Sequence, residues 1–148
     1  MGVVVVLVAA AIAVFNFQRR ARETQTAAEA APRSGRFVDA GDVKIFVQES
    51  GPATAPAVML VHGTGTWSEI WRETIDALSP DHRVIAIDLP PFGYSDKPLN
   101  ADWYTRQAQA ARLIHVLDAL HIQTVTLVGH SVGARPAVEA ALMVSAKK

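Results

Sequence analysis

One stretch of the sequence sets a serine between two glycines, as Gly-His-Ser-Val-Gly at residues 129–133. The apolar residues before it indicate a short buried strand, and the residues after it favour a helix. In a tight strand-to-helix turn, backbone segments approach so closely that the serine's neighbours must carry almost no side chain, and Gly129 and Gly133 meet that need. The turn predicts that Ser131 is a nucleophile, with the helix N-terminus stabilising a negative oxygen; the alternative is a helix-capping serine.

The elements that must position this serine alternate from Arg36 onward. Two short strand patterns flank a Gly-Asp turn and predict a β-hairpin. Three further apolar runs then alternate with three amphipathic helical patterns, in the order β-α-β-α-β-α. This order is typical of an α/β domain whose sheet is mostly parallel and covered by helices on both faces. The strands are expected at 37–39, 43–48, 57–61, 83–88 and 124–128, and the helices at 66–78, 105–120 and 132–144.

Two helix starts carry additional signals. Thr66 and Glu69 have the spacing of a capping box, which predicts a helix that begins near Thr66. Pro136 lies inside the helix that follows Ser131, although proline lacks the N–H that a helix interior needs. We therefore expect that helix to begin late or to kink.

The N-terminus is strongly apolar. Residues 1–15 carry no charged or strongly polar side chain, and arginines follow at 19, 20 and 22. We expect a transmembrane anchor over residues 1–17, because a span needs about 17–25 apolar residues, then a linker over 18–35 and a domain over 36–148. The arginines would keep that domain in the cytoplasm. The alternatives are a buried core helix and a cleaved signal peptide, which would make the protein secreted or periplasmic.

Composition excludes several classes of function. Among 148 residues, 14 are basic and 14 are acidic, so nothing points to a nucleic-acid partner. The absence of cysteine excludes disulfides, thiolate metal sites and a cysteine nucleophile. The histidines show no metal-ligand spacing. We expect a small-molecule substrate and no cofactor or metal, and the oligomeric state is left open.

Three motifs follow one another in a recognisable order. His62-Gly63 comes after an apolar strand, the loop Asp-Leu-Pro-Pro-Phe-Gly-Tyr-Ser-Asp-Lys-Pro occupies residues 88–98, and Gly-His-Ser-Val-Gly comes last. In order and spacing they resemble the N-terminal half of an α/β-hydrolase-fold enzyme, over residues 36–144. The most similar branch contains serine esterases, epoxide-hydrolase-like proteins and carbon–carbon-bond hydrolases. Dehalogenases and epoxide hydrolases of that branch carry an aspartate where this chain has Ser131, which argues against those two activities.

The resemblance implies roles for individual residues. Ser131 would attack an ester, thioester, amide or activated carbon–carbon bond, and the backbone N–H groups of Val132 and Thr64 would hold the oxyanion. His62 is expected to be structural and Asp88 to be a turn-forming carboxylate. The loop over residues 88–98 is expected to form a wall of the pocket.

The resemblance also implies a triad acid and a histidine on later strands, in the chain order Ser, Asp or Glu, His. No such strands follow Ser131 in this sequence. Two interpretations remain: a membrane-anchored serine hydrolase that is incomplete as given, or an inactive truncated or degenerate fragment that is at most a binding module. For this chain as written we expect the second, because a serine without a base reacts slowly.

Overall fold

The computed structural model describes residues 2–22 and 24–145 and divides into two compact units, Met1–Ala31 and Pro32–Lys148. The first unit contains α1 (Gly2–Arg22) and the short α2 (Ala27–Ala30). A capping box begins α2, since the Thr26 hydroxyl accepts from the Glu29 N–H while the Glu29 carboxylate accepts from the Thr26 N–H at 2.7 Å. This reciprocal pair satisfies donors that a helix start otherwise leaves free.

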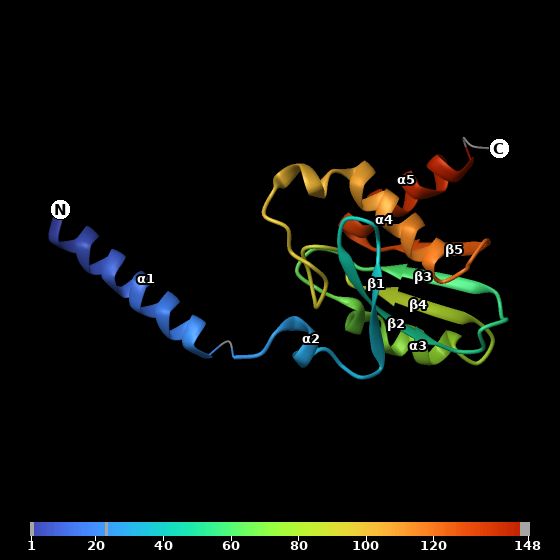
Figure 1. Cartoon of the computed structure of the whole chain (residues 1–148), viewed down its shortest axis with the longest axis horizontal. Helices are drawn as coiled ribbons and strands as arrows, with labels where there is room; N and C mark the ends of the chain where they lie inside the picture. The colour runs from blue at the N-terminus through green and yellow to red at the C-terminus, as the bar shows by residue number, and fades with distance from the viewer. Residues whose placement is uncertain (1, 23, 146–148) are drawn as a thin grey trace. The chain divides into compact units, whose positions relative to one another are not determined.

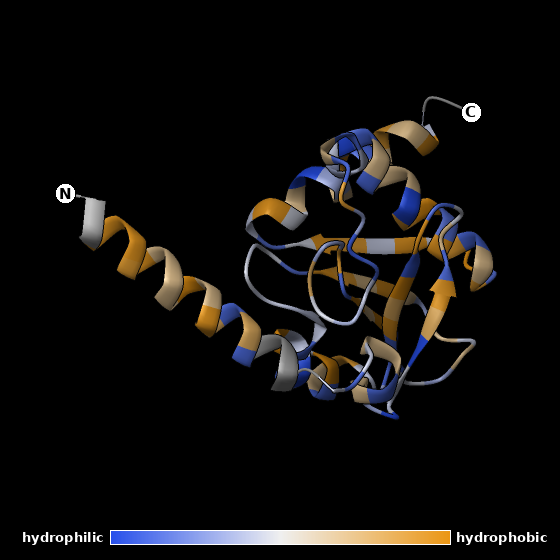
Figure 2. Cartoon of the chain, turned by 60° about the vertical axis from the view of Figure 1, so that its left-hand side comes forward, coloured by the Kyte–Doolittle hydropathy of each residue, from blue (hydrophilic) through white to orange (hydrophobic). Residues whose placement is uncertain are grey.

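The structure overturns the predicted membrane anchor. None of the helices in the described part of the chain combines the length and the apolar character that a membrane crossing requires. Figure 2 shows that the apolar stretch of α1 gives way to hydrophilic residues toward its C-terminal end. The predicted anchor over residues 1–17 and the membrane localisation that depends on it are therefore wrong, and the predicted membrane contact through this helix loses its support; Met1 lies outside the described residues.

The second unit is built on a five-stranded sheet in the order β1-β2-β4-β3-β5 (Figure 1). Antiparallel pairing joins β1 to β2 and β2 to β4, whereas β3 runs parallel to both β4 and β5. The sheet is therefore mixed and not mostly parallel, because the predicted hairpin joins the parallel strands through β2. The strands are β1 (Gly35–Asp39), β2 (Lys44–Ser50), β3 (Ala57–Val61), β4 (Arg83–Ile87) and β5 (Val125–Gly129).

Helices cover both faces of this sheet (Figure 1), as the alternating pattern predicts. On one face Val58 and Leu60 of β3 pack toward α3 (Arg72–Leu78). On the other face Met59 and Val61 belong to the larger core, with side chains of α4 (Arg106–Ala119) and α5 (Ala134–Ser145). Successive β3 residues thus serve opposite faces, as the period of a strand requires, and the sheet sits between two apolar layers.

The helix after β3 begins differently from the prediction. A 3₁₀ turn, η1 (Ser68–Trp71), precedes α3, and its N-cap residue Trp67 makes no side-chain capping bond. The Thr66 hydroxyl donates instead to the Gly63 carbonyl at 3.1 Å. The predicted capping box at Thr66 and Glu69 is wrong, because Thr66 stabilises the loop before the turn.

The helix after Ser131 begins late, as Pro136 predicts. Residues Ser131–Gly133 form the 3₁₀ turn η3, and the α-helix α5 begins only at Ala134. Pro136 therefore lies in the first turn of α5, where its missing N–H costs no intrahelical bond. The proline is buried, so it contributes to packing as well as to the helix start.

A buried arginine holds the β1–β2 hairpin against α4. The Arg112 side chain is 1% exposed, and its Nε donates to Asp42 Oδ1 at 2.9 Å. It also donates to the Trp103 carbonyl at 2.6 Å and to Gln109 Oε1 at 3.0 Å. Each donor faces an acceptor, as a buried guanidinium requires.

Acid should weaken this contact. The hydrogen bond from Arg112 is the main reason that the pKa of Asp42 lies below its ordinary value of 3.8. A carboxyl group whose pKa is lower in the folded state stabilises the fold above its unfolded pKa, and that contribution is lost as the pH falls through the folded pKa. At pH values below about 4, the free energy of unfolding should decrease with falling pH. We expect this decrease, measured by urea titration, to be less steep in Asp42→Asn than in the parent. Asp81→Asn, at an exposed turn, should keep the parent's acid dependence; an equal dependence in Asp42→Asn would contradict the linkage.

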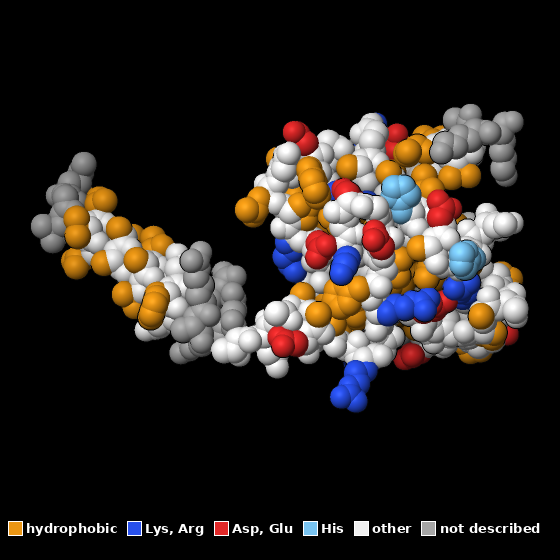
Figure 3. Space-filling model, in the orientation of Figure 1, with side chains coloured by type: hydrophobic (Ala, Val, Ile, Leu, Met, Phe, Trp, Pro, Cys, Tyr) orange, Lys and Arg blue, Asp and Glu red, His pale blue; other side chains and the backbone are white. Residues whose placement is uncertain are grey.

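Charges of both signs are interspersed on the face drawn in Figure 3. Glu49, for example, pairs with both Arg36 and Arg83, with N–O distances of 2.6 Å. Arg36 lies on β1 and Arg83 on β4, the two strands that flank β2, so this pairing joins β1, β2 and β4. One carboxylate thereby binds two guanidinium groups.

Candidate active site

Ser131 occupies a strained turn at the end of β5. Its φ is 54°, in the left-handed region that non-glycine residues rarely adopt. The preceding His130 is still extended, with φ −105° and ψ 129°, so the chain reverses direction at the serine itself. Ser131 is exposed. Such strain costs about 1–3 kcal/mol and persists where the surrounding structure enforces it, often at functional sites.

The two flanking glycines enforce this turn. A Cβ on Gly133 would lie 2.6 Å from the Val61 carbonyl oxygen and closer still to that of His62. A Cβ on Gly129 would lie 2.5 Å from Cα of Ala134. Any side chain at either position would therefore collide with backbone. The structure gives both glycines the close-approach role that their spacing around Ser131 predicts.

The His-Gly loop lies directly against the serine. It follows β3, and a Cβ on Gly63 would be 3.0 Å from Cβ of Ser131. The His130 N–H donates to the Val61 carbonyl at 2.9 Å, which joins the two turns. The loop after β3 and the turn after β5 thus form one site at the carboxyl ends of two neighbouring parallel strands.

A cavity of about 260 Å³ lies beside Ser131, and both predicted oxyanion residues, Thr64 and Val132, line it. Apolar residues of the loop over residues 88–98 form a wall of it, as expected. The sequence analysis missed the two charged residues of the lining. Arg106 and Arg135 lie in the first turns of α4 and α5. Ligands of open α/β sheets bind at the carboxyl edge of the sheet, so charged residues at helix starts near that edge were the signal for them in the sequence. The other lining residues are Leu89, Pro90, Pro91, Phe92, Tyr104, Gln109 and Pro136.

His62 is buried beneath this cavity, and its two ring nitrogens have different roles. Nδ1 donates to the Gly63 carbonyl at 2.7 Å, and Nε2 accepts from the Leu89 N–H at 2.8 Å. Burial lowers the pKa of His62, which favours the neutral ring that an acceptor nitrogen requires. Because both nitrogens are engaged, His62 positions the two loops, in agreement with the structural role expected for it.

Asp88 organises the neighbouring loop from a fully buried position at the end of β4. Its Oδ1 accepts from the Ser68 N–H and its Oδ2 from the Tyr94 N–H, both at 2.7 Å. The Asp88 carbonyl also accepts from the Ser95 hydroxyl at 2.6 Å. The carboxylate therefore forms the turn, as predicted, and holds the cavity wall to the η1 turn.

Residues 56–147 match the profile of the alpha/beta hydrolase fold family. The chain belongs to the α/β-hydrolase fold family. This family assignment agrees with the mixed sheet, with helices on both faces, and with the strained serine after β5. The resemblance drawn from the three sequence motifs is thereby confirmed.

Curated relatives of this α/β-hydrolase catalyse different reactions. An epoxide hydrolase of Caballeronia sordidicola is 40% identical over 102 residues, which cover 68% of this chain and 30% of the relative. A 2-hydroxymuconate semialdehyde hydrolase of a Pseudomonas species is 38% identical over 106 residues, which cover 69% of this chain and 36% of the relative. A haloalkane dehalogenase of Psychrobacter cryohalolentis is 39% identical over 87 residues, which cover 58% of this chain and 29% of the relative.

Solved structures show the same partial coverage. A mutant of the Vigna radiata epoxide hydrolase superposes with a TM-score of 0.70 at 31% identity, covering 74% of this chain and 34% of the other. Epoxide hydrolase A of Mycobacterium thermoresistibile superposes with a TM-score of 0.70 at 30% identity, and the match covers 73% of this chain and 34% of the other. This α/β-hydrolase chain thus spans about a third of the length of the relatives that it matches.

The described part of this α/β-hydrolase contains no histidine in hydrogen-bonding contact with Ser131. His62 is engaged by Gly63 and Leu89, and Nδ1 of His115 donates to the Ala40 carbonyl at 2.6 Å. The His130 ring packs edge-on against Trp71, with ring centroids 6.5 Å apart. Within residues 2–22 and 24–145, no group of three or more His, Asp or Glu side chains is arranged to hold a metal ion.

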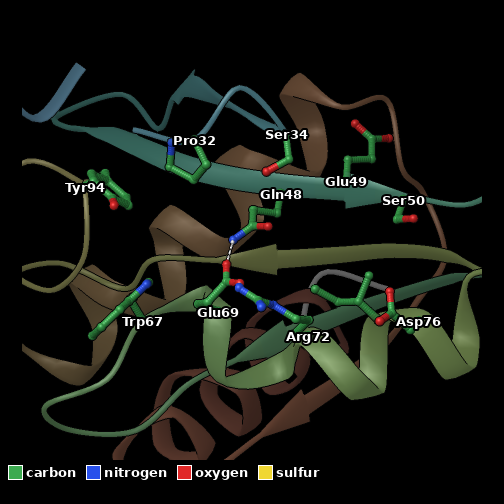
Figure 4. A pocket seen from close by; sticks show the side chains of 11 residues that line it. Pro32, Ser34, Gln48, Glu49, Ser50, Trp67, Glu69, Arg72, Asp76 and Tyr94 are labelled. Atoms are coloured by element: carbon green, nitrogen blue, oxygen red, sulfur yellow. Dashed lines mark hydrogen bonds and ion pairs between the residues drawn. The ribbon is translucent and has the colours of Figure 1, made fainter. Parts of the chain in front are cut away.

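A second, larger pocket of about 570 Å³ lies elsewhere in this α/β-hydrolase, between β2 and the η1–α3 segment (Figure 4). Figure 4 shows Gln48 of β2 pointing at Glu69, to which it donates at 3.2 Å, with Trp67 and Tyr94 at one end. Glu69 is also paired with Arg72. The polar groups at its centre therefore bind one another, and none of the predicted catalytic residues lines it.

Proposed function

We propose that the protein is a serine hydrolase that acts by acyl transfer on an ester, thioester, amide or activated carbon–carbon bond. The strained, exposed Ser131 supports this most strongly. Two glycines that tolerate no side chain hold it in place, and it adjoins a cavity lined by Thr64 and Val132. A binding cavity thus lies next to the nucleophile, since Val132 follows Ser131 in the chain.

In the proposed reaction Ser131 Oγ bonds to the carbonyl carbon of the substrate and gives up its proton to a base. The carbonyl oxygen becomes an oxyanion, which the N–H groups of Val132 and Thr64 stabilise. The first N–H groups of a helix have no intrahelical partner, so the turn after Ser131 is suited to this role. The leaving group then departs with a proton, and water hydrolyses the acyl-serine ester to the acid.

A serine nucleophile favours acyl transfer over the reactions named for two of the relatives. Attack of a serine oxygen on an alkyl halide or an epoxide carbon would form an ether, which water does not cleave under mild conditions. Attack on a carbonyl forms an ester, which water does cleave. Only the second course regenerates Ser131.

The base that this mechanism requires is not found among the described residues, because none of the described histidines makes a hydrogen bond to Ser131. We propose that a full-length protein supplies it, as the partial coverage of the relatives allows. The second candidate function is an inactive binding module. The absence of a described histidine partner for Ser131 favours it for the 148-residue chain, since a serine without a base retains only a small fraction of its rate.

Covalent labelling of the chain tests the nucleophile directly. We expect a fluorophosphonate to react slowly with the chain, because no described residue serves as a base for Ser131, and to add a phosphonyl group that peptide mass spectrometry locates on Ser131. Ser131→Ala should lose this label completely, while Ser79→Ala, at a helix end away from the cavity, should keep it. Hydrolysis of 4-nitrophenyl acetate should be faster in the parent than in Ser131→Ala; equal rates and equal labelling would contradict the assignment.

A further inference from the structure

The cavity beside Ser131 has a positive charge and no acidic counterpart in its lining. Its charged lining residues are Arg106 and Arg135, and none of the lining residues is Asp or Glu. The remaining wall is largely apolar and includes Pro90, Pro91 and Phe92. A ligand that fits this lining has an apolar body and a negative group.

The two arginines differ in how they are paired. Arg106 Nε donates to Glu139 Oε2 of α5 at 2.9 Å, and this ion pair neutralises the charge of the guanidinium. No ion pair between described residues involves Arg135, which is exposed. Arg106, Glu139 and Arg135 together therefore leave one net positive charge, centred on Arg135.

Two other polar side chains of the lining, those of Gln109 and Tyr104, already make hydrogen bonds. Gln109 donates through Nε2 to the Pro90 carbonyl, and its Oε1 accepts from Arg112 at 3.0 Å. The Tyr104 hydroxyl donates to the Pro98 carbonyl. The guanidinium groups are therefore the charged donors that remain for a ligand, beside the Thr64 hydroxyl.

Two helix starts add to this positive potential. Arg106 is the first residue of α4, and Arg135 is the second residue of α5. The N-terminal end of a helix carries about half a positive charge and favours anions. Both helices are long enough for this effect, with 14 and 12 residues.

From these observations we propose that the substrate carries a carboxylate, which binds Arg135 with support from Arg106 while its apolar body lies against the Pro90–Phe92 wall. One net charge matches a monoanion, and the planar guanidinium pairs bidentately with a carboxylate. The proposal rests on the proposed function, because it places the scissile carbonyl at Ser131. A site of this kind selects anionic acyl compounds over the neutral substrates that Ser131 could also attack.

Binding of two molecules of the same shape tests the proposal without relying on catalysis. Phenylacetate carries the carboxylate, and phenylacetamide replaces it with a neutral amide. By calorimetric titration of the full chain, we expect phenylacetate to bind about tenfold more tightly, which corresponds to about 1.4 kcal/mol. Arg135→Gln should abolish the preference, and Arg106→Gln should reduce it.

Two control variants separate this proposal from the proposed function. Arg72→Gln removes an exposed arginine of the other pocket and should keep the preference for phenylacetate. Ser131→Ala should also keep it while losing the phosphonyl label, so loss of the label alone bears only on the nucleophile. Equal binding of the two probes, binding of neither, or an equal loss in Arg72→Gln and Arg135→Gln would overturn the carboxylate site.

Discussion

Gly133→Ala is expected to lower the free energy of unfolding by about 3 kcal/mol, the upper range for overpacking a well-packed site. The new Cβ would collide with the Val61 and His62 carbonyl oxygens, and these atoms belong to the end of β3 and cannot rotate away. The turn after β5 would have to move away from the His-Gly loop. Urea titration followed by tryptophan fluorescence would measure the loss, and phosphonyl labelling of Ser131 should decrease with it.

Gly65→Ala is a control in which the added Cβ causes backbone strain without a collision. A Cβ at Gly65 would meet nothing within 4 Å, but its φ of 74° lies in the left-handed region. Only backbone strain remains there, which costs about 1–2 kcal/mol for an ordinary L-residue. If Gly133→Ala were no more destabilising than Gly65→Ala, close backbone approach would not be what holds the serine turn.

Asp88→Asn is expected to lower the free energy of unfolding by about 2–3 kcal/mol, because it leaves a buried donor unsatisfied. The two Asp88 oxygens accept separate N–H groups, from Ser68 and from Tyr94. An asparagine can offer its oxygen to one of them, and its NH₂ group then faces the other donor. The wall of the cavity should loosen as well, so limited proteolysis should cut the loop over residues 88–98 faster than in the parent.

Asp96→Asn provides the matched control for this change. Asp96 lies in the same loop and its Oδ2 accepts a single N–H, that of Lys44, at 2.7 Å, but the residue is exposed. An asparagine there keeps an acceptor for Lys44 and places its NH₂ in water. We expect a change within about 0.5 kcal/mol, as is usual at the surface. A similar loss in both variants would mean that the burial of Asp88 is not the cause.

The candidate site also depends on a neutral His62. Its Nε2 can accept from Leu89 only while the ring is unprotonated, and burial favours that state by lowering its pKa. One buried ring therefore holds the loop that carries Thr64 against the loop that forms the cavity wall. In this arrangement the loop that carries Thr64, a predicted oxyanion residue, is positioned by a side chain that is not among the lining residues of the cavity.

The sequence by itself determined the features that depend on short-range patterns. Apolar runs such as 57–61 must be buried on both faces, so their alternation with helical patterns predicts the layers correctly. The glycine spacing around Ser131 reflects a local steric demand, and Pro136 predicts a late helix start because a missing N–H is a property of one residue.

Tertiary structure alone decided the features that depend on contacts between distant segments. The hairpin enters the sheet through β2 and β4, which makes the sheet mixed, and Thr66 binds its loop instead of capping a helix. Arg106 and Arg135, 29 positions apart in the sequence numbering, line one cavity only because α4 and α5 both begin at the same edge of the sheet. Neighbouring residues encode strand, turn and helix, whereas the charge of a cavity depends on which elements the folded chain brings together.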